Sequence, residues 1–556
     1  ELIKAYAGEG DEISAWWEIT GELCKKAGIG FRGIWTEEHD DRVNSAYSIG
    51  YTPEERRKLV DAYMADFYGV FGFYPKTIGS WVLDTVTVSY AAEKYGILGS
   101  AICRDQMGTD GFTLWGGFPN GVYYPSRSNE NIPASTCGGQ LPVPMFRLLG
   151  PDPIYSFEQD VRKGLHGVYT LEPSWLIGRN PEWISWFFGC LTKEDALGVG
   201  YAHVGQENNF LWENIRPGME PQLKKLCEML EQPSEYGEVR VETMADTAAW
   251  YRRRYRLPPP MSFQASRDWD TDRKLSAQWY ACCNYRVGFL GEEGRLRIRD
   301  FFLYRQDYPS RYLEGPMSVD GASAASNFDA LPLLFPQLWI GQSGRRPLLD
   351  GEDREPRGII RYLALDELTA AAQLRDEATD ELLAVFTMRP DTLMIEGDFR
   401  LCFDFLPVFR ARNGREVVLE HEKFSYGFGV PEGEICRAGR DGLEIRPEQG
   451  RIVIRLGDAV SRETFFADGD FAEDAGGKNF HGRGWKPMEP AGIPGRIVVP
   501  PMGPEAEPVS CVFAAGDTGI VRLSSAIPGE IRYTLDGTEP LKDASLYDGP
   551  LRLTQD

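Results

Sequence analysis

The 556-residue chain lacks the motifs that mark several large enzyme classes. It has no Gly-x-Gly-x-x-Gly followed by a helical pattern, no Gly-x-x-x-x-Gly-Lys-Ser/Thr loop and no Gly-x-Ser-x-Gly turn. An acidic calcium loop of the EF-hand type and a C-terminal lipidation signal are also missing. These absences argue against a dinucleotide-dependent enzyme, a P-loop nucleotidase and a serine hydrolase of the nucleophile-elbow type.

Cysteine and histidine are too few and too scattered for the usual disulfide and metal frameworks. The ten cysteines contain no Cys-x-x-Cys pair, so we expect most of them, including Cys282 and Cys283, to be buried small apolar residues. Only five histidines are present, and no two of them are four residues apart. The sequence therefore lacks a helix turn with two metal-binding histidines.

Long apolar runs and runs of basic residues are missing as well. No stretch of about 18 apolar residues is present, so we expect no membrane-spanning helix. The formal charge of −23 would repel nucleic-acid phosphates, which predicts no nucleic-acid partner and a neutral or modestly charged substrate. The chain begins with Glu1 rather than Met, which we interpret as a trimmed or mature form.

The residues before the triple proline at 258–260 alternate between short apolar runs and helical patterns. Such alternation is typical of parallel α/β structure, and a closed barrel of seven or eight β/α units over residues 1–257 is the natural solution. The expected strands are 31–35, 77–83, 97–103, 154–157, 167–171, 199–204 and 239–243. The expected helices are 2–27, 53–69, 86–95, 181–189, 219–231 and 245–255.

Beyond the triple proline the pattern changes to strict alternation of apolar and polar residues. The clearest segments are 295–304, 392–405, 415–430 and 450–456, which predict an antiparallel β-sandwich over residues 262–498. A Pro-rich stretch at 499–508 reads as a linker. We expect residues 509–556 to form a small immunoglobulin-like β domain, so the chain should hold about three domains.

The stretch from Lys76 to Asn129 predicts a strand, a helix and a second strand with polar residues just past each strand. Asp84 follows the first strand, and Arg104, Asp105 and Gln106 follow the second. Ligands meet α/β sheets at the carboxyl ends of the strands. The loop that follows is rich in glycine and aromatic residues, and carboxylates beside flat aromatic rings indicate a carbohydrate site.

Four acidic residues are expected at strand ends and supply the candidate catalytic groups. Hydrolysis of a glycosidic bond needs a pair of carboxyl groups, one to protonate the leaving oxygen and one to attack or activate water. Glu172 and Glu207 are the first candidates, followed by Asp105, while Asp84 is expected to bind substrate or orient a neighbour. Which of them acts as the acid stays open. The expected substrate-binding residues are Asp84, Trp81, Arg104, Gln106, Trp115, Tyr123, Trp175, Gln206, Asn208 and Trp212.

The tail segment EIRYTLDGTEPLKDASLYDGPLRL (530–553) resembles the small immunoglobulin-like C-terminal domain of chitobiases and β-hexosaminidases. The matching positions are Tyr533, Thr534, Asp536, Gly537, Pro540, Ser545, Tyr547, Gly549 and Pro550. The resemblance implies a bacterial, carbohydrate-active enzyme that is secreted, periplasmic or on the cell surface, and it carries no catalytic residues. Residues 1–255 resemble, more loosely, the polysaccharide-deacetylase-like barrel superfamily, which includes glycoside hydrolase barrels, in their strand count and in the closing helix after VRVETMAD (239–246). The paired segments LEPSW and GQENNF resemble those of gut-bacterial glycoside hydrolases.

These observations predict a glycoside hydrolase that acts on a complex glycan through paired carboxylates and needs no obligatory cofactor. One alternative is a metal-dependent carbohydrate deacetylase, in which a divalent cation activates water; His39 and Asp40 are the residues to consider as ligands. A second alternative is a non-catalytic glycan-binding protein. The identity of the sugar and the stereochemistry of the reaction are not determined by the sequence.

Overall fold

The computed structural model divides into two compact units. One unit is Ser14–Met488, and the other combines Glu1–Ile13 with Glu489–Asp556. The residues described are 2–8, 10–33, 43–107, 112–157, 168–205, 211–271, 274–317, 325–328, 331–334, 348–350, 356–403, 405–467, 518–521, 532–533, 545–546 and 551–554. In the larger unit we call residues 14–260 the α/β part and residues 261–467 the antiparallel part.

The α/β part is built on a five-stranded sheet whose strands are short and largely buried. Its order is β1-β2-β3-β7-β6, with β1, β2, β3 and β7 parallel and β6 antiparallel to β7. The strands are β1 (Ala15–Trp16), β2 (Thr77–Ser80), β3 (Gly99–Ile102), β6 (Val122–Tyr123) and β7 (Met145–Arg147). The described strands form an open sheet, so the mixed α/β class is confirmed, whereas a closed barrel is not shown.

Helix boundaries in this part follow the capping residues in the sequence. Helix α4 (Pro53–Phe71) begins with a capping box between Thr52 and Glu55 and has proline at its first position. Helix α5 (Thr85–Tyr95) is capped by the Asp84 carboxylate, which accepts the Thr87 N–H, and ends at Gly96 in the left-handed conformation. The predicted helix 53–69 and the predicted unit over 77–103 are therefore confirmed.

The prediction of a single helix over residues 2–27 is wrong. The structure has helix α1 (Leu2–Tyr6), strand β1 and helix α2 (Gly21–Ala27) there. Strand β1 buries Ala15, leaves Trp16 exposed, and is followed by a buried Trp17, which is the period-two pattern of a strand. Thr20 then caps α2 by accepting the Leu23 N–H. The local sequence around Trp16 and Trp17 is compatible with either a helix or a strand. The segment forms a strand because it pairs with β2.

Several strands predicted after β7 are also absent among the described residues. Residues Tyr155–Phe157 form the 3-10 helix η3, and only an isolated bridge joins Pro151 to Thr170. Residues 199–204 and 239–243 have no strand. Around η3 the cause is local, because Pro151 and Pro153 lack an N–H and the Asp152 carboxylate accepts the N–H groups of Ile154 and Tyr155 instead.

The remaining long helices of the α/β part occur where helices are predicted, although α7 begins seven residues before its predicted start at 219. They are α6 (Pro181–Thr192), α7 (Trp212–Glu231) and α9 (Met244–Arg254). The short helices are α3 (Val43–Ala46), η1 (Ser48–Gly50), η5 (Ile177–Arg179) and α8 (Pro233–Tyr236). Among the described residues no helix is long and apolar enough to cross a bilayer.

The antiparallel part contains three sheets, and its predicted alternating segments are confirmed as strands. The five-stranded sheet comprises β8 (Met261–Ala265), β9 (Leu275–Ala281), β10 (Tyr285–Glu292), β11 (Arg295–Leu303) and β13 (Leu331–Leu334). The eight-stranded sheet comprises β15 (Ile359–Ala364), β16 (Ala370–Arg375), β17 (Leu382–Met388), β18 (Thr392–Glu396), β25 (Arg451–Arg455), β22 (Phe424–Glu432), β21 (Glu416–His421) and β20 (Phe409–Asn413). The four-stranded sheet comprises β14 (Leu348–Asp350), β19 (Arg400–Phe403), β24 (Gly442–Arg446) and β23 (Glu434–Gly439), and helix α11 (Arg462–Phe465) follows β25.

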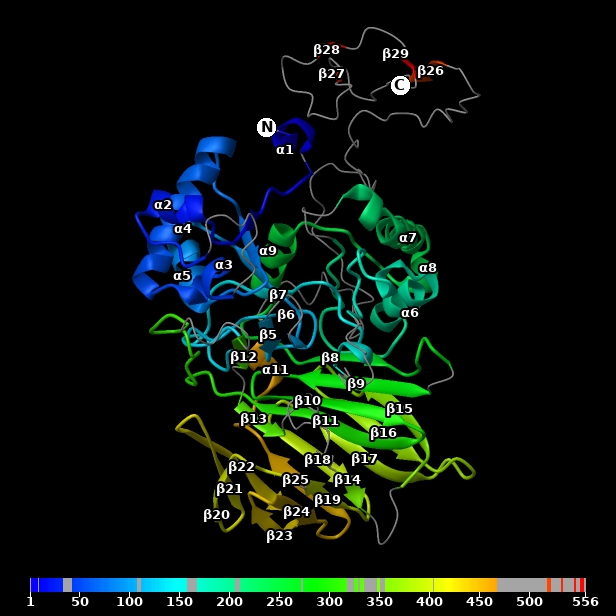
Figure 1. The fold of residues 1–556 in the computed structure, drawn as a ribbon. Coiled ribbons are helices and arrows are strands. Elements are labelled where there is room, and N and C mark those ends of the chain that lie inside the picture. The colour runs from blue at the N-terminus through cyan, green and yellow to red at the C-terminus, as the bar shows by residue number, and fades with distance from the viewer. Residues whose placement is uncertain are drawn as a thin grey trace. The chain divides into compact units, whose positions relative to one another are not determined.

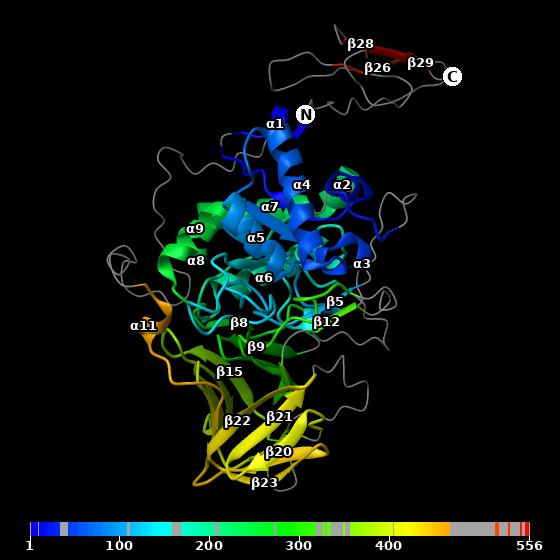
Figure 2. The same ribbon diagram turned by 90° about the vertical axis from the view of Figure 1, so that its left-hand side faces the viewer.

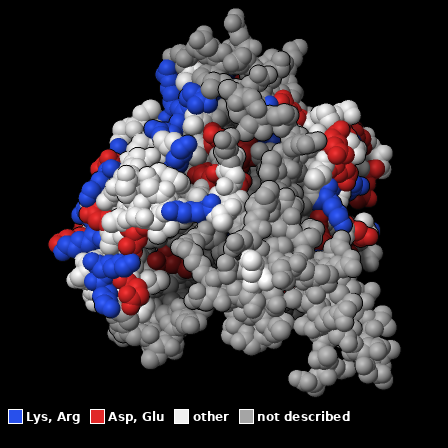
Figure 3. All heavy atoms as spheres, turned by 90° about the horizontal axis from the view of Figure 1, so that it is seen from above, with Lys and Arg blue, Asp and Glu red and all other residues white. Residues whose placement is uncertain are grey.

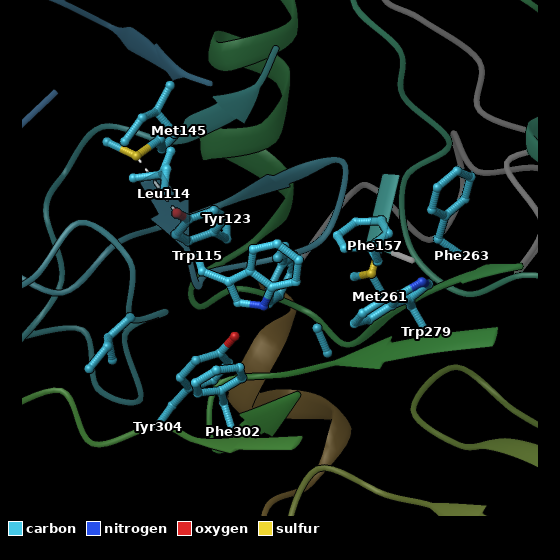
Figure 4. Close-up of a cluster of buried hydrophobic side chains, with 14 of the residues drawn as sticks. Leu114, Trp115, Tyr123, Met145, Phe157, Met261, Phe263, Trp279, Phe302 and Tyr304 are labelled. Carbon is cyan, nitrogen blue, oxygen red and sulfur yellow. Dashed lines mark hydrogen bonds between the residues drawn. The ribbon is translucent and has the colours of Figure 1, made fainter. Parts of the chain in front are cut away.

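The five-stranded sheet of the antiparallel part, which begins with β8, lies between the helices of the α/β part and the eight-stranded sheet (Figures 1 and 2). Phe289 of β10 contacts Phe386 of β17, with ring centroids 5.1 Å apart. On its other face the same sheet packs against the α/β part, where the ring centroids of Phe157 and of Trp279 in β9 are 4.3 Å apart (Figure 4). One apolar core therefore runs through both parts.

A small sheet also joins the two parts. Strand β12 (Ala325–Phe328) pairs in parallel with β5 (Phe112–Trp115), which in turn pairs with β4 (Gln106–Met107). In the second unit, β26 (Thr518–Val521) pairs with β29 (Leu551–Thr554), and β27 (Arg532–Tyr533) pairs with β28 (Ser545–Leu546), all antiparallel. The tail therefore has the predicted β content, while the predicted boundaries at 257, 262, 498 and 509 stay predictions.

Candidate functional site

Parallel strands β1, β2, β3 and β7 bring their carboxyl ends to the same edge of the sheet, as the sequence predicts. Asp84 follows β2 there, and Arg104, Asp105 and Gln106 follow β3. All four side chains are buried. The edge is covered by the antiparallel part, because Arg286 of β10 reaches Asp105 and the backbone of Met317 bonds that of Ile49.

Asp105 is fully enclosed in an ion cluster that joins the two parts. Its Oδ1 accepts hydrogen bonds from Arg147 Nη2 (2.7 Å) and the Gly116 N–H, and its Oδ2 accepts one from Arg286 Nη1 (2.9 Å). Arg286 Nη2 also donates to Asp300 Oδ2 at 2.9 Å. We call Asp105, Arg147, Arg286 and Asp300 the strand-end ion cluster.

The strand-end ion cluster holds two cations and two anions with no measurable exposure of the Asp105 and arginine side chains. Burial raises the pKa of Asp300 despite the nearby Arg286, while the two carboxylates raise the pKa of Arg286 against the effect of burial. Both oxygens of Asp105 are already engaged. This geometry gives Asp105 a structural role and no support for the predicted catalytic one.

Asp84 is likewise committed to the structure. Its Oδ1 accepts from Arg56 Nη1 at 3.0 Å and from the Thr87 N–H, and its Oδ2 accepts from the Ser48 and Thr87 hydroxyls. Burial alone would raise the pKa of Asp84, but Arg56 and these hydroxyls outweigh burial and hold it below its ordinary value. Asp84 is therefore a helix cap and half of a buried ion pair.

Three of the predicted aromatic platforms, Trp81, Trp115 and Tyr123, belong to the buried core. The Trp115 indole is fully buried and donates to Asp300 Oδ2 at 2.8 Å, and the Tyr123 hydroxyl donates to the Glu130 carbonyl. Burial raises the pKa of Tyr123 to about 12. Trp81 is also largely buried. The rings of Trp115 and Tyr123 are buried and therefore cannot stack against a sugar ring in this arrangement.

The polar neighbours of Asp105 are buried with it. Arg104 Nη1 donates to the Asp105 carbonyl at 2.6 Å, and the Gln106 amide oxygen lies 3.5 Å from the Cys103 sulfur. The nine described cysteines are all free, and five of them, including Cys282 and Cys283, are buried, as expected for small apolar residues.

Glu172 stands in a different setting, on a loop that several groups fix in place. Its side chain is only 8% exposed, and its Oε1 accepts a hydrogen bond from the Ser174 hydroxyl at 3.1 Å. The Thr170 hydroxyl accepts the Glu172 N–H. Arg179 binds the next two carbonyls, with Nε on Pro173 and Nη2 on Ser174. The loop is therefore held through its backbone as well as through the Ser174 hydroxyl.

Two glycines allow neighbouring elements to approach this loop closely. A side chain at Gly178 would lie 2.2 Å from the Glu172 carbonyl oxygen, and one at Gly218 of α7 would lie 2.6 Å from Pro173. The Gln222 amide of α7 donates to the carbonyls of Leu171 and Gly178. Helix α7 and η5 thus pack closely against the loop and against each other.

Exposed apolar side chains lie on the Glu172 loop and at the start of the neighbouring helix α7. Trp175 is 39% exposed and Trp212 at the start of α7 is 37% exposed. Arg179 Nη2 binds both the Ser174 and the Asn214 carbonyls, so the two segments are adjacent. We call Glu172, Trp175, Leu176, Leu211 and Trp212 the Glu172 lip. Among the predicted platforms, Trp175 and Trp212 are the ones whose rings are open to solvent.

Several predicted site residues lie outside the described residues. They are Glu207, Gln206, Asn208, His39 and Asp40. The described neighbour of this segment, His203, is buried, and burial lowers its pKa to about 4, so it is neutral and its Nδ1 accepts the Leu149 N–H. Within the described ranges no group of three or more His, Cys, Asp or Glu side chains is arranged to hold a metal ion.

An aromatic and acidic group lies at the end of β1, and of its three members the sequence predicted Trp81 but neither Trp16 nor Glu18. Trp16 is 37% exposed, and its indole donates to Glu18 Oε1 at 2.9 Å. Its ring meets Trp81 edge to face, with centroids 5.1 Å apart and an interplanar angle of 81°. We call Trp16, Glu18 and Trp81 the β1 platform. Because the pattern over residues 2–27 predicts a helix, it does not mark Glu18 as an acid that follows a strand.

Comparisons with known proteins give a family match to the tail and matches to solved structures. Residues 521–556 match the family model described as Fn3 associated, on the same segment that resembles the chitobiase-type domain. No curated protein matches the chain in sequence. Among solved structures, a candidate glycoside hydrolase/deacetylase from Parabacteroides distasonis is 14% identical with a TM-score of 0.35, over 51% of this chain and 67% of that one. At these values the likeness defines no shared fold, and the family match describes the tail alone.

Proposed function

We propose that the protein hydrolyses glycosidic bonds of a neutral glycan at the Glu172 lip. The observation that carries the proposal is a carboxylate on a clamped loop, little exposed and bound by Ser174, three residues before the exposed indole of Trp175. Sugar rings present an apolar face that packs on indoles, and their hydroxyls bind carboxylates. The proposal does not need a closed barrel, since the loop is fixed by η5 and α7.

The second carboxyl group of the proposed reaction is Glu207. Retention of configuration needs the two carboxyl groups about 5 Å apart, and inversion needs roughly 6.5 to 9.5 Å. Glu172 then acts on one face of the scissile bond and Glu207 on the other. Neither Asp84 nor Asp105 takes part, because both are engaged by arginines.

The surface charge fits a neutral substrate. On the face seen in Figure 3, basic and acidic side chains of the described residues are interspersed, with neither sign forming a continuous field. An anionic polymer would be repelled by the net charge of −23. We include export from the cell in the proposal, since a glycan substrate would be met outside it.

A glycan-binding protein without turnover is the second candidate. It is favoured by one observation, namely that two of the four strand-end acids predicted for the site are locked in buried ion pairs. In that case the Glu172 lip would bind sugars through Trp175 and Trp212 and leave the glycosidic bonds intact.

Product analysis of the purified full chain separates these functions. The chain is incubated with plant, fungal and bacterial polysaccharides, in native and chemically O-acetylated form, with and without EDTA. Hydrolysis predicts new reducing ends that persist in EDTA. Release of acetate alone, abolished by EDTA, would establish the metal-dependent deacetylase instead, and binding without either product would establish the binding protein.

A further inference from the structure

The β1 platform is a rigid surface at the opposite end of the strand edge from the Glu172 lip. The Trp16 ring lies over Gly79 of β2, where a side-chain carbon would come within 3.4 Å of the ring. Trp81 supports it from the edge. The next residue, Trp17, is buried on the other face of the sheet with its ring 5.5 Å from Tyr63 of α4. These contacts fix the Trp16 indole before any ligand arrives.

Glu18 adds a polar group beside the ring. Its Oε1 accepts the Trp16 indole N–H, which sets the position of the carboxylate relative to the ring. Within the part of the chain that the structure describes, its Oε2 makes no hydrogen bond. The side chain is half-buried, so that oxygen can accept a bond from a ligand hydroxyl.

We propose that the β1 platform binds a neutral sugar ring as a subsite separate from the Glu172 lip. The apolar C–H face of the sugar packs on the exposed part of the Trp16 indole, and a ring hydroxyl donates to Glu18 Oε2. Sugars that carry carboxylate or sulfate groups are repelled by Glu18. The choice of sugars as the ligand class rests on the proposed function.

The spacing of the sheet makes this a distinct subsite. The order β1-β2-β3-β7 places three inter-strand steps between β1 and β7, about 14 Å at the usual strand separation. Glu172 lies beyond β7, on a loop whose Leu171 bonds to the Leu149 and Gly150 carbonyls. A single sugar ring cannot contact both sites, so the ligand that uses both is an oligosaccharide.

Calorimetric titration of the full chain tests the proposal. The probes are cellohexaose, laminarihexaose and mannohexaose, with an oligogalacturonate of the same length as the anionic probe. Trp16→Ala is expected to weaken the tightest neutral probe at least about tenfold, a loss of about 1.4 kcal/mol. Trp16→Phe should retain part of the affinity, and Glu18→Ala should weaken binding without removing the ring. The matched control is Phe73→Ala, an exposed aromatic residue after α4.

The outcomes decide the two proposals separately. The subsite proposal is overturned if Trp16→Ala and Phe73→Ala bind with equal affinity. It is also overturned if the wild-type chain binds no neutral probe. Stronger binding of the oligogalacturonate than of the neutral probes overturns its ligand class. If the wild-type chain shows no turnover but Trp16→Ala weakens its glycan binding, the subsite proposal is supported and the hydrolase proposal is contradicted. If Trp16→Ala does not fold, Trp16→Phe and Glu18→Ala decide, and unchanged affinity in both overturns the subsite.

Discussion

Asp105 and Glu172 both follow apolar runs of the α/β part, and the molecule uses them in opposite ways. Asp105 is enclosed by Arg147 and by Arg286, which comes from the antiparallel part. Glu172 is held by a serine hydroxyl on a clamped loop beside an exposed indole. The difference teaches that position after a strand does not define the role of an acid. The element packed against that strand end decides it.

The largest effect is expected from breaking the strand-end ion cluster. Asp105→Ala leaves two buried guanidinium groups without one of their two carboxylates, which should lower the free energy of unfolding by about 3–5 kcal/mol. Denaturant unfolding of the full chain measures it. Asp66→Ala, which removes an exposed partner of Lys26, is the control and should cost less than about 1 kcal/mol. Similar losses in both variants would contradict the structural role of Asp105.

A second test uses Asp84, which combines an ion pair with a helix cap. Asp84→Ser keeps a capping hydroxyl and removes the charge opposite Arg56, whereas Asp84→Ala removes both. The alanine variant should be less stable than the serine variant by about 1 kcal/mol, the value of an N-cap. Equal stabilities at pH 7 would show that the Asp84 cap contributes nothing.

The pH dependence of Asp84 follows from its lowered pKa. The folded state binds its proton less tightly than the unfolded state, so the stabilisation is complete above the ordinary carboxyl pKa of about 3.9. It is lost as the pH falls through the lower folded value. The stability difference between wild type and Asp84→Ser should therefore shrink below about pH 4. If the stability difference instead grows as the pH falls, the pKa of Asp84 is raised by folding rather than lowered.

Asp152 extends the comparison, since it is buried with three N–H donors and, among the described residues, no arginine partner. Burial raises its pKa to about 6. Because the folded pKa exceeds the unfolded value, its contribution is present below about pH 3.9 and is lost as the pH rises through about 6. Relative to Asp152→Asn, the wild type should lose about 2–3 kcal/mol between pH 4 and pH 7. Parallel stability curves across this range would contradict the shift.

The smallest effect on stability is expected at the Glu172 lip. Trp175→Ala and Trp212→Ala remove partly exposed rings and should change the free energy of unfolding by at most about 1 kcal/mol. Both should nevertheless weaken glycan binding, which titration with neutral hexasaccharides measures. Phe73→Ala is again the control. A large loss of stability without loss of binding would place these indoles among the structural residues.

The sequence predicted those elements whose signals are local. Alternating residues located β11, β18, β21 and β25, and capping residues located α4 and α5. It failed where local signals conflict, as at the Trp16–Trp17 pair, or where prolines and an aspartate replace a strand by a turn at 151–155.

The candidate site was predictable in part. Glu172 and Trp175 were predicted from the apolar run before Glu172 and the turn at Pro173, and their functional role stays a prediction. The fate of Asp105 was not predicted, since its partner Arg286 lies 181 residues away in another sheet. No spacing rule connects residues so far apart, and only folding of the antiparallel part onto the strand ends brings them together.

The most direct test of the account is the effect of Glu172→Gln on turnover and on stability in the same full-length protein. The substitution removes the acid and keeps the size of the side chain and an oxygen for Ser174. We expect turnover of the cleaved glycan to fall at least about 100-fold, the usual share of acid–base catalysis, while the unfolding midpoint stays unchanged. Retained turnover, or a loss of turnover that only mirrors a loss of stability, would contradict the assignment of Glu172 as the functional carboxylate.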